Sequence, residues 1–166
     1  MIKVLFVCMG NICRSPTAQG VFEQLIAAEG LTHGIGADSA GTTAYHLGQA
    51  PDGRAAAVAA ARGVDLTGYR ARQVEAADFH AFDLVLAMDR DNFAAMERIV
   101  PRERAPRLRM FLEFAPGLGI DDVPDPYYGG TDGFERVLDI IEAGSQGVLA
   151  HIRAEFGDSL GPAAGR

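Results

Sequence analysis

The sequence predicts an α/β fold, with a four-stranded, doubly wound parallel sheet and helices on both of its faces. Continuous apolar runs at residues 2–7 and 82–88 are typical of strands that are buried on both faces. Segments with helical spacing follow both runs, and this alternation favours a parallel sheet with right-handed crossovers. The length of 166 residues fits one domain, which we expect over residues 1–157, with a frayed tail over residues 158–166.

The first strand, IKVLFV at residues 2–7, is expected at the centre of the sheet because it is apolar on both faces. Ser15 and Pro16 are expected to start the next helix, with Ser15 as the N-cap and Pro16 at the first helical position. Apolar residues continue at helical spacing until Gly30 ends the pattern.

A short second strand is expected to end near Ser39, followed by a loop over residues 42–49. An alanine-rich helix then runs from Pro51 and Asp52 to about Arg62. Both elements fit the alternation that the sheet requires.

The third strand is expected at residues 82–88, FDLVLAM, and Asp89 is the predicted N-cap of a helix that ends near Val100. A shorter run at residues 107–111, RLRMF, predicts the fourth strand.

The last third of the chain starts with a proline- and glycine-rich loop, residues 115–133. A final helix is expected from about Phe134 to Phe156. In sheets of this kind ligands bind beyond the carboxyl ends of the strands, and the loop after the first strand lies there.

The net charge of −7 argues against non-specific binding of nucleic acid or of an acidic membrane surface. No apolar stretch approaches the roughly 20 residues that a membrane-spanning helix needs. Cys8 and Cys13 lie close together, which disfavours a secreted disulfide framework and indicates reactive thiols. We therefore expect a cytoplasmic protein that is a monomer or at most a weak dimer.

The segment CMGNICRSP, residues 8–16, has the features of an oxyanion-binding loop. A loop that enters a helix directs several backbone N–H groups and the positive end of the helix dipole toward one point. Gly10 permits close approach, and the Arg14 guanidinium can hold two phosphate oxygens. The same positive field favours the thiolate of Cys8, so Cys8 is the candidate nucleophile for phosphoryl transfer.

A departing alkoxide or phenoxide needs a proton, so a second group must act as a general acid. Asp125 precedes Pro126, which rigidifies a loop able to hold the carboxyl over Cys8. Asp125 could then act as the base for the water that hydrolyses a phosphocysteine. Each of these residues alone is more often a packing, surface or turn residue, and their combination favours the catalytic interpretation.

Four segments together resemble the low-molecular-weight protein tyrosine phosphatases. They are VCMGNICRSP at residues 7–16, DSAGT at 38–42, ARQ at 71–73 and DPYYGG at 125–130. The resemblance covers nearly the whole chain in order and spacing. It implies a flavodoxin-like sheet, a phosphocysteine intermediate, phosphotyrosine-containing proteins or small aryl phosphates as substrates, and no metal or cofactor.

By position, the resemblance makes Cys8 the nucleophile, Arg14 the phosphate clamp and Asp125 the general acid. It further implies loop, bracing and substrate-contacting roles for Met9, Gly10, Asn11, Ile12, Cys13, Ser15, Ser39, Tyr45, Tyr127 and Tyr128. Two positions leave specificity open: Tyr69 stands where many relatives carry His, and Met9 lies next to the nucleophile at a position that often differs between relatives.

Three other functions remain open from the sequence. An arsenate reductase of the thioredoxin-coupled kind needs further cysteines, and none follows Cys13. A non-catalytic phosphate-binding module would not need both Cys8 and Asp125. A phosphotransferase component would pass a phosphoryl group from Cys8 to a partner protein. The physiological substrate also stays open among a tyrosine-phosphorylated protein, a polysaccharide-export kinase and a small molecule.

Cys13 itself has two interpretations. It could resolve a sulfenic acid on Cys8 by forming a reversible disulfide, because both thiols belong to one tight loop. It could instead be an apolar filler behind the loop.

Overall fold

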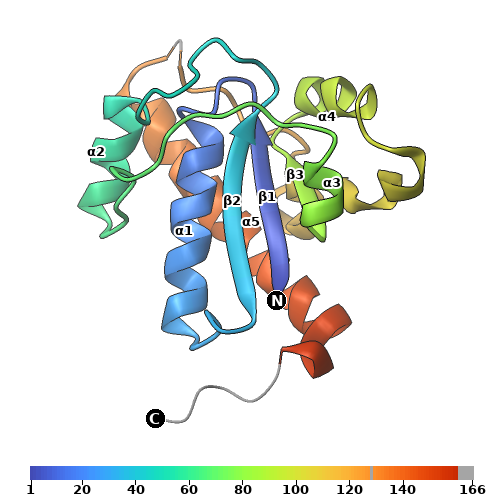
Figure 1. Ribbon diagram of the computed structural model, residues 1–166. Helices are drawn as coiled ribbons and strands as arrows, with labels where there is room; N and C mark the ends of the chain where they lie inside the picture. Colours follow the sequence, from blue (N-terminus) through green and yellow to red (C-terminus); the bar gives the residue numbers. More distant parts are fainter. Residues whose placement is uncertain (128, 161–166) are drawn as a thin grey trace.

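The centre of the computed structural model, which describes residues 1–127 and 129–160, is a four-stranded sheet (Figure 1). Its strands are β1 (Ile2–Cys8), β2 (Ile35–Gly41), β3 (Leu84–Ala87) and β4 (Leu108–Met110). They run in the order β2-β1-β3-β4, and every neighbouring pair is parallel. This is a flavodoxin-like order with β1 inside the sheet, so the predicted fold class is confirmed.

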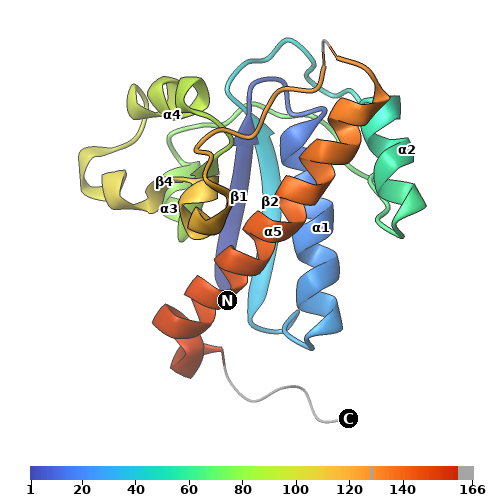
Figure 2. The same ribbon diagram turned by 180° about the vertical axis from the view of Figure 1, so that it is seen from behind.

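Helices pack on both faces of the sheet. They are α1 (Arg14–Ala28), α2 (Gly53–Ala61), α3 (Asp78–Ala81), α4 (Arg90–Glu97) and α5 (Thr131–Phe156). Val4 and Phe6 of β1 belong to a core cluster with residues of α1, α2 and α5, whereas Leu5 and Val7 pack with residues of α3 and α4. Figure 2 shows α5 alongside α1, with α3 and α4 on the other side of the molecule. The alternation of side chains along β1 therefore builds two separate cores.

Helix α1 begins at Arg14, so the prediction of Ser15 as its N-cap is wrong. The N-cap position is Cys13, which provides no side-chain cap. The Ser15 hydroxyl is instead bonded to Cys8 and Asn11 in the preceding loop. Pro16 still lies in the first turn, where a missing N–H removes no helical hydrogen bond.

Other element boundaries differ from the sequence prediction by a few residues. Helix α4 ends at Glu97 rather than Val100, and α5 begins at Thr131 rather than Phe134. The positions of helix ends depend on backbone hydrogen bonds, which cannot be seen in the pattern of apolar residues. The short helix α3 and 3₁₀ turns at Arg102–Arg107, Phe111–Phe114 and Pro116–Leu118 were not predicted.

The predicted tail, residues 158–166, overlaps a 3₁₀ turn at Gly157–Ser159, and Leu160 is buried against the Gly34 backbone. Residues 161–166 lie outside the described residues. Among the described residues, no helix is long and apolar enough to cross a membrane.

The carboxyl ends of the strands bring three loops together. The Cys8 carbonyl at the end of β1 accepts from the Thr42 amide after β2, at 2.9 Å. The Met88 amide after β3 donates to the Val7 carbonyl at 3.0 Å, and the Met88 carbonyl accepts from the Val123 amide at 2.8 Å. The loop before α5 is thereby placed next to the loop after β1, at the edge where parallel sheets bind ligands.

Candidate active site

The phosphate loop, defined as residues 8–14, leaves the end of β1 and enters α1. Asn11 adopts φ +56°, and it is the only non-glycine residue among those described with a positive φ. A side chain at Gly41 of β2 would lie 2.7 Å from the Met9 carbonyl, so a glycine there allows the loop to lie against the strand. The amides of residues 10–13 donate to no group within residues 1–127 or 129–160. The curved loop, its amides at residues 10–13 and the start of α1 together suit a bound oxyanion.

Asn11 braces the phosphate loop from inside. Its amide nitrogen donates to the hydroxyls of Ser15, at 2.8 Å, and Ser39, at 3.0 Å. Its carbonyl oxygen accepts from the Arg72 amide at 3.0 Å. The Ser15 hydroxyl in turn lies 3.0 Å from the Cys8 sulfur. The two donated bonds and the one accepted bond fit a single orientation of the Asn11 amide. Because Asn11 donates to the Ser15 oxygen, the Ser15 hydrogen stays available for the Ala40 carbonyl, at 3.3 Å, or the Cys8 sulfur.

The bracing network continues away from the thiol to Tyr69. The Ser39 hydroxyl donates to Gln19 at 2.7 Å, and Gln19 donates to Glu23 at 3.1 Å. The Tyr69 hydroxyl donates to the same Glu23 carboxylate. Burial and this hydrogen bond raise the pKa of Tyr69, so the phenol stays protonated. The network therefore ends in a Tyr69–Glu23 pair.

Arg14 is 3% exposed and is held by groups from two other loops. Its Nη1 donates to Asp89 at 2.6 Å and to the Val123 carbonyl at 3.0 Å. Burial acts to lower the pKa of Arg14, but negative charge on Cys8 and on the neighbouring carboxylates raises it above its ordinary value. The guanidinium stays charged, and its place beside the loop is fixed before substrate arrives.

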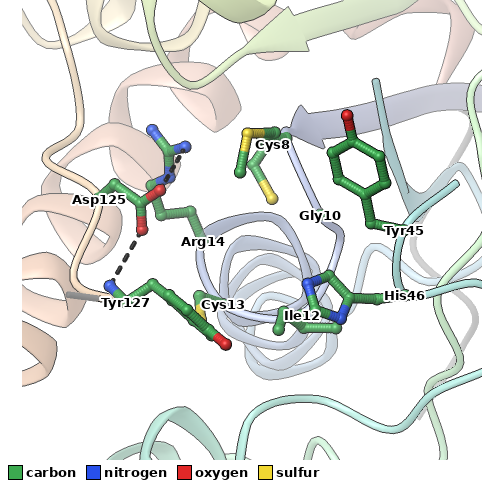
Figure 3. Close-up of a pocket in the computed structure, with 10 residues that line it drawn as sticks. Cys8, Gly10, Ile12, Cys13, Arg14, Tyr45, His46, Asp125 and Tyr127 are labelled. Carbon is green, nitrogen blue, oxygen red and sulfur yellow. Dashed lines mark hydrogen bonds and ion pairs between the residues drawn. The ribbon is translucent and has the colours of Figure 1, made fainter. Parts of the chain in front are cut away.

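Asp125 lies at the mouth of the site, with its carboxyl turned toward Arg14 (Figure 3). One carboxylate oxygen is 3.6 Å from Arg14 Nη2, and the other accepts from the Tyr127 amide at 3.0 Å. Its side chain is 32% exposed, so it is open to solvent and to a substrate.

These groups line one pocket of about 340 Å³. Cys8, Cys13 and Arg14 are buried at its base, whereas Tyr45 and Tyr127 are 78% and 38% exposed. The remaining lining residues are Met9, Gly10, Ile12, His46 and Asp125. In Figure 3 the Tyr45 and Tyr127 rings come from different loops on opposite sides of the base. Tyr128 lies outside the described residues.

The structure brings nearly all the predicted site residues to this pocket or to the hydrogen bonds behind it. Ser39, Asn11 and Ser15 form the bracing network, and the other predicted residues within the described part of the chain line the pocket. Sequence reasoning missed two residues. Asp89 was predicted only as a helix cap, a role in which it does accept from Asn92 at 2.7 Å, but its other oxygen holds Arg14. His46 was predicted only as part of the loop over residues 42–49, although its position next to Tyr45 could have indicated that it lines the pocket.

His46 contributes to the wall of the pocket. Its ring lies so close to Gly10 that a Cβ at residue 10 would come within 2.8 Å of it. Its ring centroid is 6.3 Å from that of Tyr127, and Nδ1 is 2.9 Å from Gln49 Oε1. The absence of a side chain at Gly10 thus makes room for the imidazole.

Cys13 faces the pocket at the start of α1 and is a free thiol, as is Cys8. Burial, followed by the negative charge of Asp52, raises the pKa of the Cys13 thiol to about 12. Cys13 is therefore protonated at neutral pH. In the described part of the chain, no cluster of three or more His, Cys, Asp or Glu side chains is arranged to hold a metal ion.

A thiol in an oxyanion loop, with a buried arginine and a carboxylate lining the same pocket, defines the class of cysteine-dependent phosphatases. The chain belongs to the low-molecular-weight protein tyrosine phosphatase family: the family model described as "Low molecular weight phosphotyrosine protein phosphatase" matches residues 3–157. It is a protein-tyrosine phosphatase, and a phosphocysteine mechanism is general to this family.

Individual relatives agree with this membership. The low molecular weight protein-tyrosine-phosphatase of Streptomyces coelicolor is 46% identical over 156 residues, covering 92% of this chain and 94% of the relative. YfkJ of Bacillus subtilis is 39% identical over 155 residues, covering 93% and 98%.

Solved structures are also similar. The protein tyrosine phosphatase of Entamoeba histolytica with Hepes in the active site has a TM-score of 0.89 at 39% identity, covering 95% of this chain and 99% of that one. The crystal structure of YfkJ has a TM-score of 0.89 at 38% identity, covering 94% and 97%.

Proposed function

We propose that Cys8 is the nucleophile, Arg14 the phosphate clamp and Asp125 the general acid of this phosphatase. The observation that carries the proposal is that all three line one pocket, with one Asp125 carboxylate oxygen 3.6 Å from Arg14 Nη2. The phosphate loop amides and Arg14 bind the phosphoryl oxygens and gain strength as negative charge builds up on them in the transition state.

In the first step the Cys8 sulfur attacks phosphorus and the bond to the ester oxygen breaks. Asp125 gives its proton to that oxygen, so a neutral phenol leaves and Asp125 becomes a carboxylate. In the second step Asp125 takes a proton from water as the water oxygen attacks phosphorus. The bond between phosphorus and sulfur breaks, and Cys8 leaves as a thiolate that accepts a hydrogen bond from Ser15.

The shape of the pocket supports an aryl phosphate as substrate. The thiol is 3% exposed at the base, whereas the tyrosines on the walls are partly or largely exposed. The ring of phosphotyrosine can place its phosphate at the base between such walls. The side chain of phosphoserine is shorter. We propose a phosphotyrosine-containing protein, with small aryl phosphates as alternative substrates, and no nucleic-acid partner because the net charge is −7.

We further propose that the enzyme acts as a monomer, or at most a weak dimer, in the cytoplasm, where free thiols stay reduced. The alternative chemistry of an arsenate reductase is disfavoured because the sequence has two cysteines and Cys13 is protonated at neutral pH. A phosphotransferase would hold its phosphoryl group until a partner protein arrives.

The test is rapid acid quenching during turnover of p-nitrophenyl phosphate, followed by peptide mass spectrometry. We expect one phosphoryl group on Cys8 in the wild type and in Cys13→Ser, and none in Cys8→Ser. Free phosphate should appear in water without any added protein, which a phosphotransferase would not produce. A phosphoryl group on another residue, or activity in Cys8→Ser above about one-hundredth of wild type, would overturn the assignment.

A further inference from the structure

The acid loop, defined as residues 123–127, is tied to the phosphate loop at its first residue. The Val123 amide donates to the Met88 carbonyl at 2.8 Å, and the Val123 carbonyl accepts from Arg14 at 3.0 Å. At the other end, the Tyr127 amide donates to the Asp125 carboxylate at 3.0 Å. The direction of the Asp125 carboxyl therefore depends on where the backbone of Tyr127 is held.

Arg54, in the first turn of α2, contacts Tyr127 from outside the pocket. Its Nη2 donates to the Tyr127 carbonyl at 3.0 Å, and its guanidinium carbon lies 5.4 Å from the centroid of the Tyr127 ring. The same guanidinium lies 4.8 Å from the ring centroid of Phe134, which is buried in α5. Arg54 thus holds the end of the acid loop against a fixed part of the core.

Arg54 is itself oriented by Asp52. Its Nε and Nη2 lie 3.1 Å and 3.0 Å from the two carboxylate oxygens, which is a two-pronged contact. The hydrogen bond from Arg54 is the main cause that holds the pKa of Asp52 below its ordinary value. The Asp52 amide also donates to the carbonyl of Ile12 at 2.8 Å. A continuous path of contacts therefore runs from the phosphate loop through Asp52 and Arg54 to the acid loop.

We propose that Arg54 is a positioning residue for the general acid: it fixes the backbone of Tyr127 and thereby the Asp125 carboxyl over the Cys8 sulfur. This inference rests on the proposed role of Asp125. Arg54 does not line the pocket, so it acts through Tyr127. An exposed arginine contributes little to the stability of the fold, but a displacement of the acid by about 1 Å can cost up to about 100-fold in rate.

The test is Arg54→Met, which replaces the guanidinium with an unbranched apolar side chain and so removes the hydrogen-bond donors. We expect kcat/KM for phosphotyrosine to fall about 10- to 100-fold. With 2,4-dinitrophenyl phosphate, whose leaving group needs no proton, kcat/KM should change little. The inhibition constant of inorganic phosphate should also change little, because the phosphate loop stays intact. Equal losses on both substrates, or a matching loss of phosphate affinity, would overturn the inference.

Arg62→Met is the matched control. Arg62 is the C-cap of the same helix, and its ion pairs join α2 to Glu135, Asp139 and Glu142 of α5. No hydrogen bond or ion pair within the described residues joins it to the acid loop. We expect both substrates to react with Arg62→Met as they do with wild type. A loss of phosphotyrosine selectivity in both variants would mean that the attachment of α2 to α5, rather than the contact of Arg54 with Tyr127, positions the acid.

Asp125→Ala separates this inference from the proposed function. If Asp125→Ala discriminates between the two substrates and Arg54→Met does not, the positioning role of Arg54 is wrong and Asp125 remains the acid. If Asp125→Ala affects both substrates equally, the acid assignment and this inference are both wrong. In the double variant, Arg54→Met should add little to the loss from Asp125→Ala, because both act on one proton transfer. Additive losses would contradict the proposed coupling.

Discussion

The Ser15 hydroxyl oxygen lies 3.0 Å from the Cys8 sulfur, and its other contacts determine where its hydrogen goes. Asn11 donates to this oxygen at 2.8 Å, so the oxygen is an acceptor there. The Ala40 carbonyl is a competing acceptor, but it lies farther away, at 3.3 Å. The hydrogen is therefore best placed to stabilise a thiolate on Cys8, whether before attack or as the leaving group.

Ser15→Ala should slow the hydrolysis of the phosphocysteine more than its formation. A hydrogen bond to a charged group contributes about 1.5–3 kcal/mol, so kcat should fall about 10- to 150-fold. Phosphocysteine should then accumulate, seen as a burst of p-nitrophenol equal to the enzyme concentration. A variant with unchanged kcat and no burst would mean that Ser15 only braces the loop.

Arg14→Lys should show that the planar shape of the guanidinium matters as well as its charge. A lysine keeps one positive charge but cannot hold two phosphoryl oxygens while also bonding Asp89. We expect kcat to fall about 10²- to 10³-fold and KM to rise as well, because ground-state and transition-state contacts are both lost. Steady-state kinetics measures both values, and the melting temperature checks that the Asp89 side of the site remains folded. Activity near that of wild type would contradict a two-pronged contact.

Local patterns explain why much of the fold and the core of the site could be predicted. Cys8 and Arg14 belong to one continuous segment between a strand and a helix, so the chain itself places them together. Asp125 stood out because a proline follows it in a loop. The buried runs of β1 and β3 were visible because both of their faces are apolar.

Contacts between distant segments explain what was missed. Asp89 is 75 residues from Arg14 in the sequence, and its side chain serves as a helix cap and as an arginine partner at once. Arg54 is 73 residues from Tyr127 in the sequence, and no pattern in its own helix indicates that it contacts this residue. The Ser15 cap was a plausible local pattern that lost to tertiary hydrogen bonds with Asn11 and Cys8. Such residues become visible only when the packing of the loops is known.

Asp125→Ala should discriminate between substrates by their leaving groups. Phosphotyrosine needs a proton on its departing oxygen, so its kcat should fall about 10²- to 10⁴-fold. An activated aryl phosphate needs less help and should lose less in kcat/KM, which reports only the steps up to cleavage of the ester. Steady-state kinetics on both substrates makes the comparison. Equal losses in kcat/KM would remove Asp125 from the acid role.

Cys13 should protect Cys8 from irreversible oxidation if it resolves a sulfenic acid there. Both thiols lie at the base of one pocket, which places them in the same part of the loop. Peroxide should then inactivate the wild type through a Cys8–Cys13 disulfide that dithiothreitol reverses. Cys13→Ser should keep most of its phosphatase activity and lose this recovery. Mass spectrometry of the non-reduced peptides would show the disulfide directly.

The pH dependence of that recovery follows from the raised pKa of Cys13, about 12, which burial causes first and Asp52 second. The thiolate is the attacking form, so at a pH well below this value only a small fraction of Cys13 can react, and that fraction grows about tenfold per pH unit. The recoverable share of activity after a fixed peroxide dose should therefore be larger at pH 8.5 than at pH 6.5 in the wild type, and show no such rise in Cys13→Ser. Full recovery of Cys13→Ser after prolonged peroxide would mean that Cys13 protects nothing and is an apolar filler behind the loop.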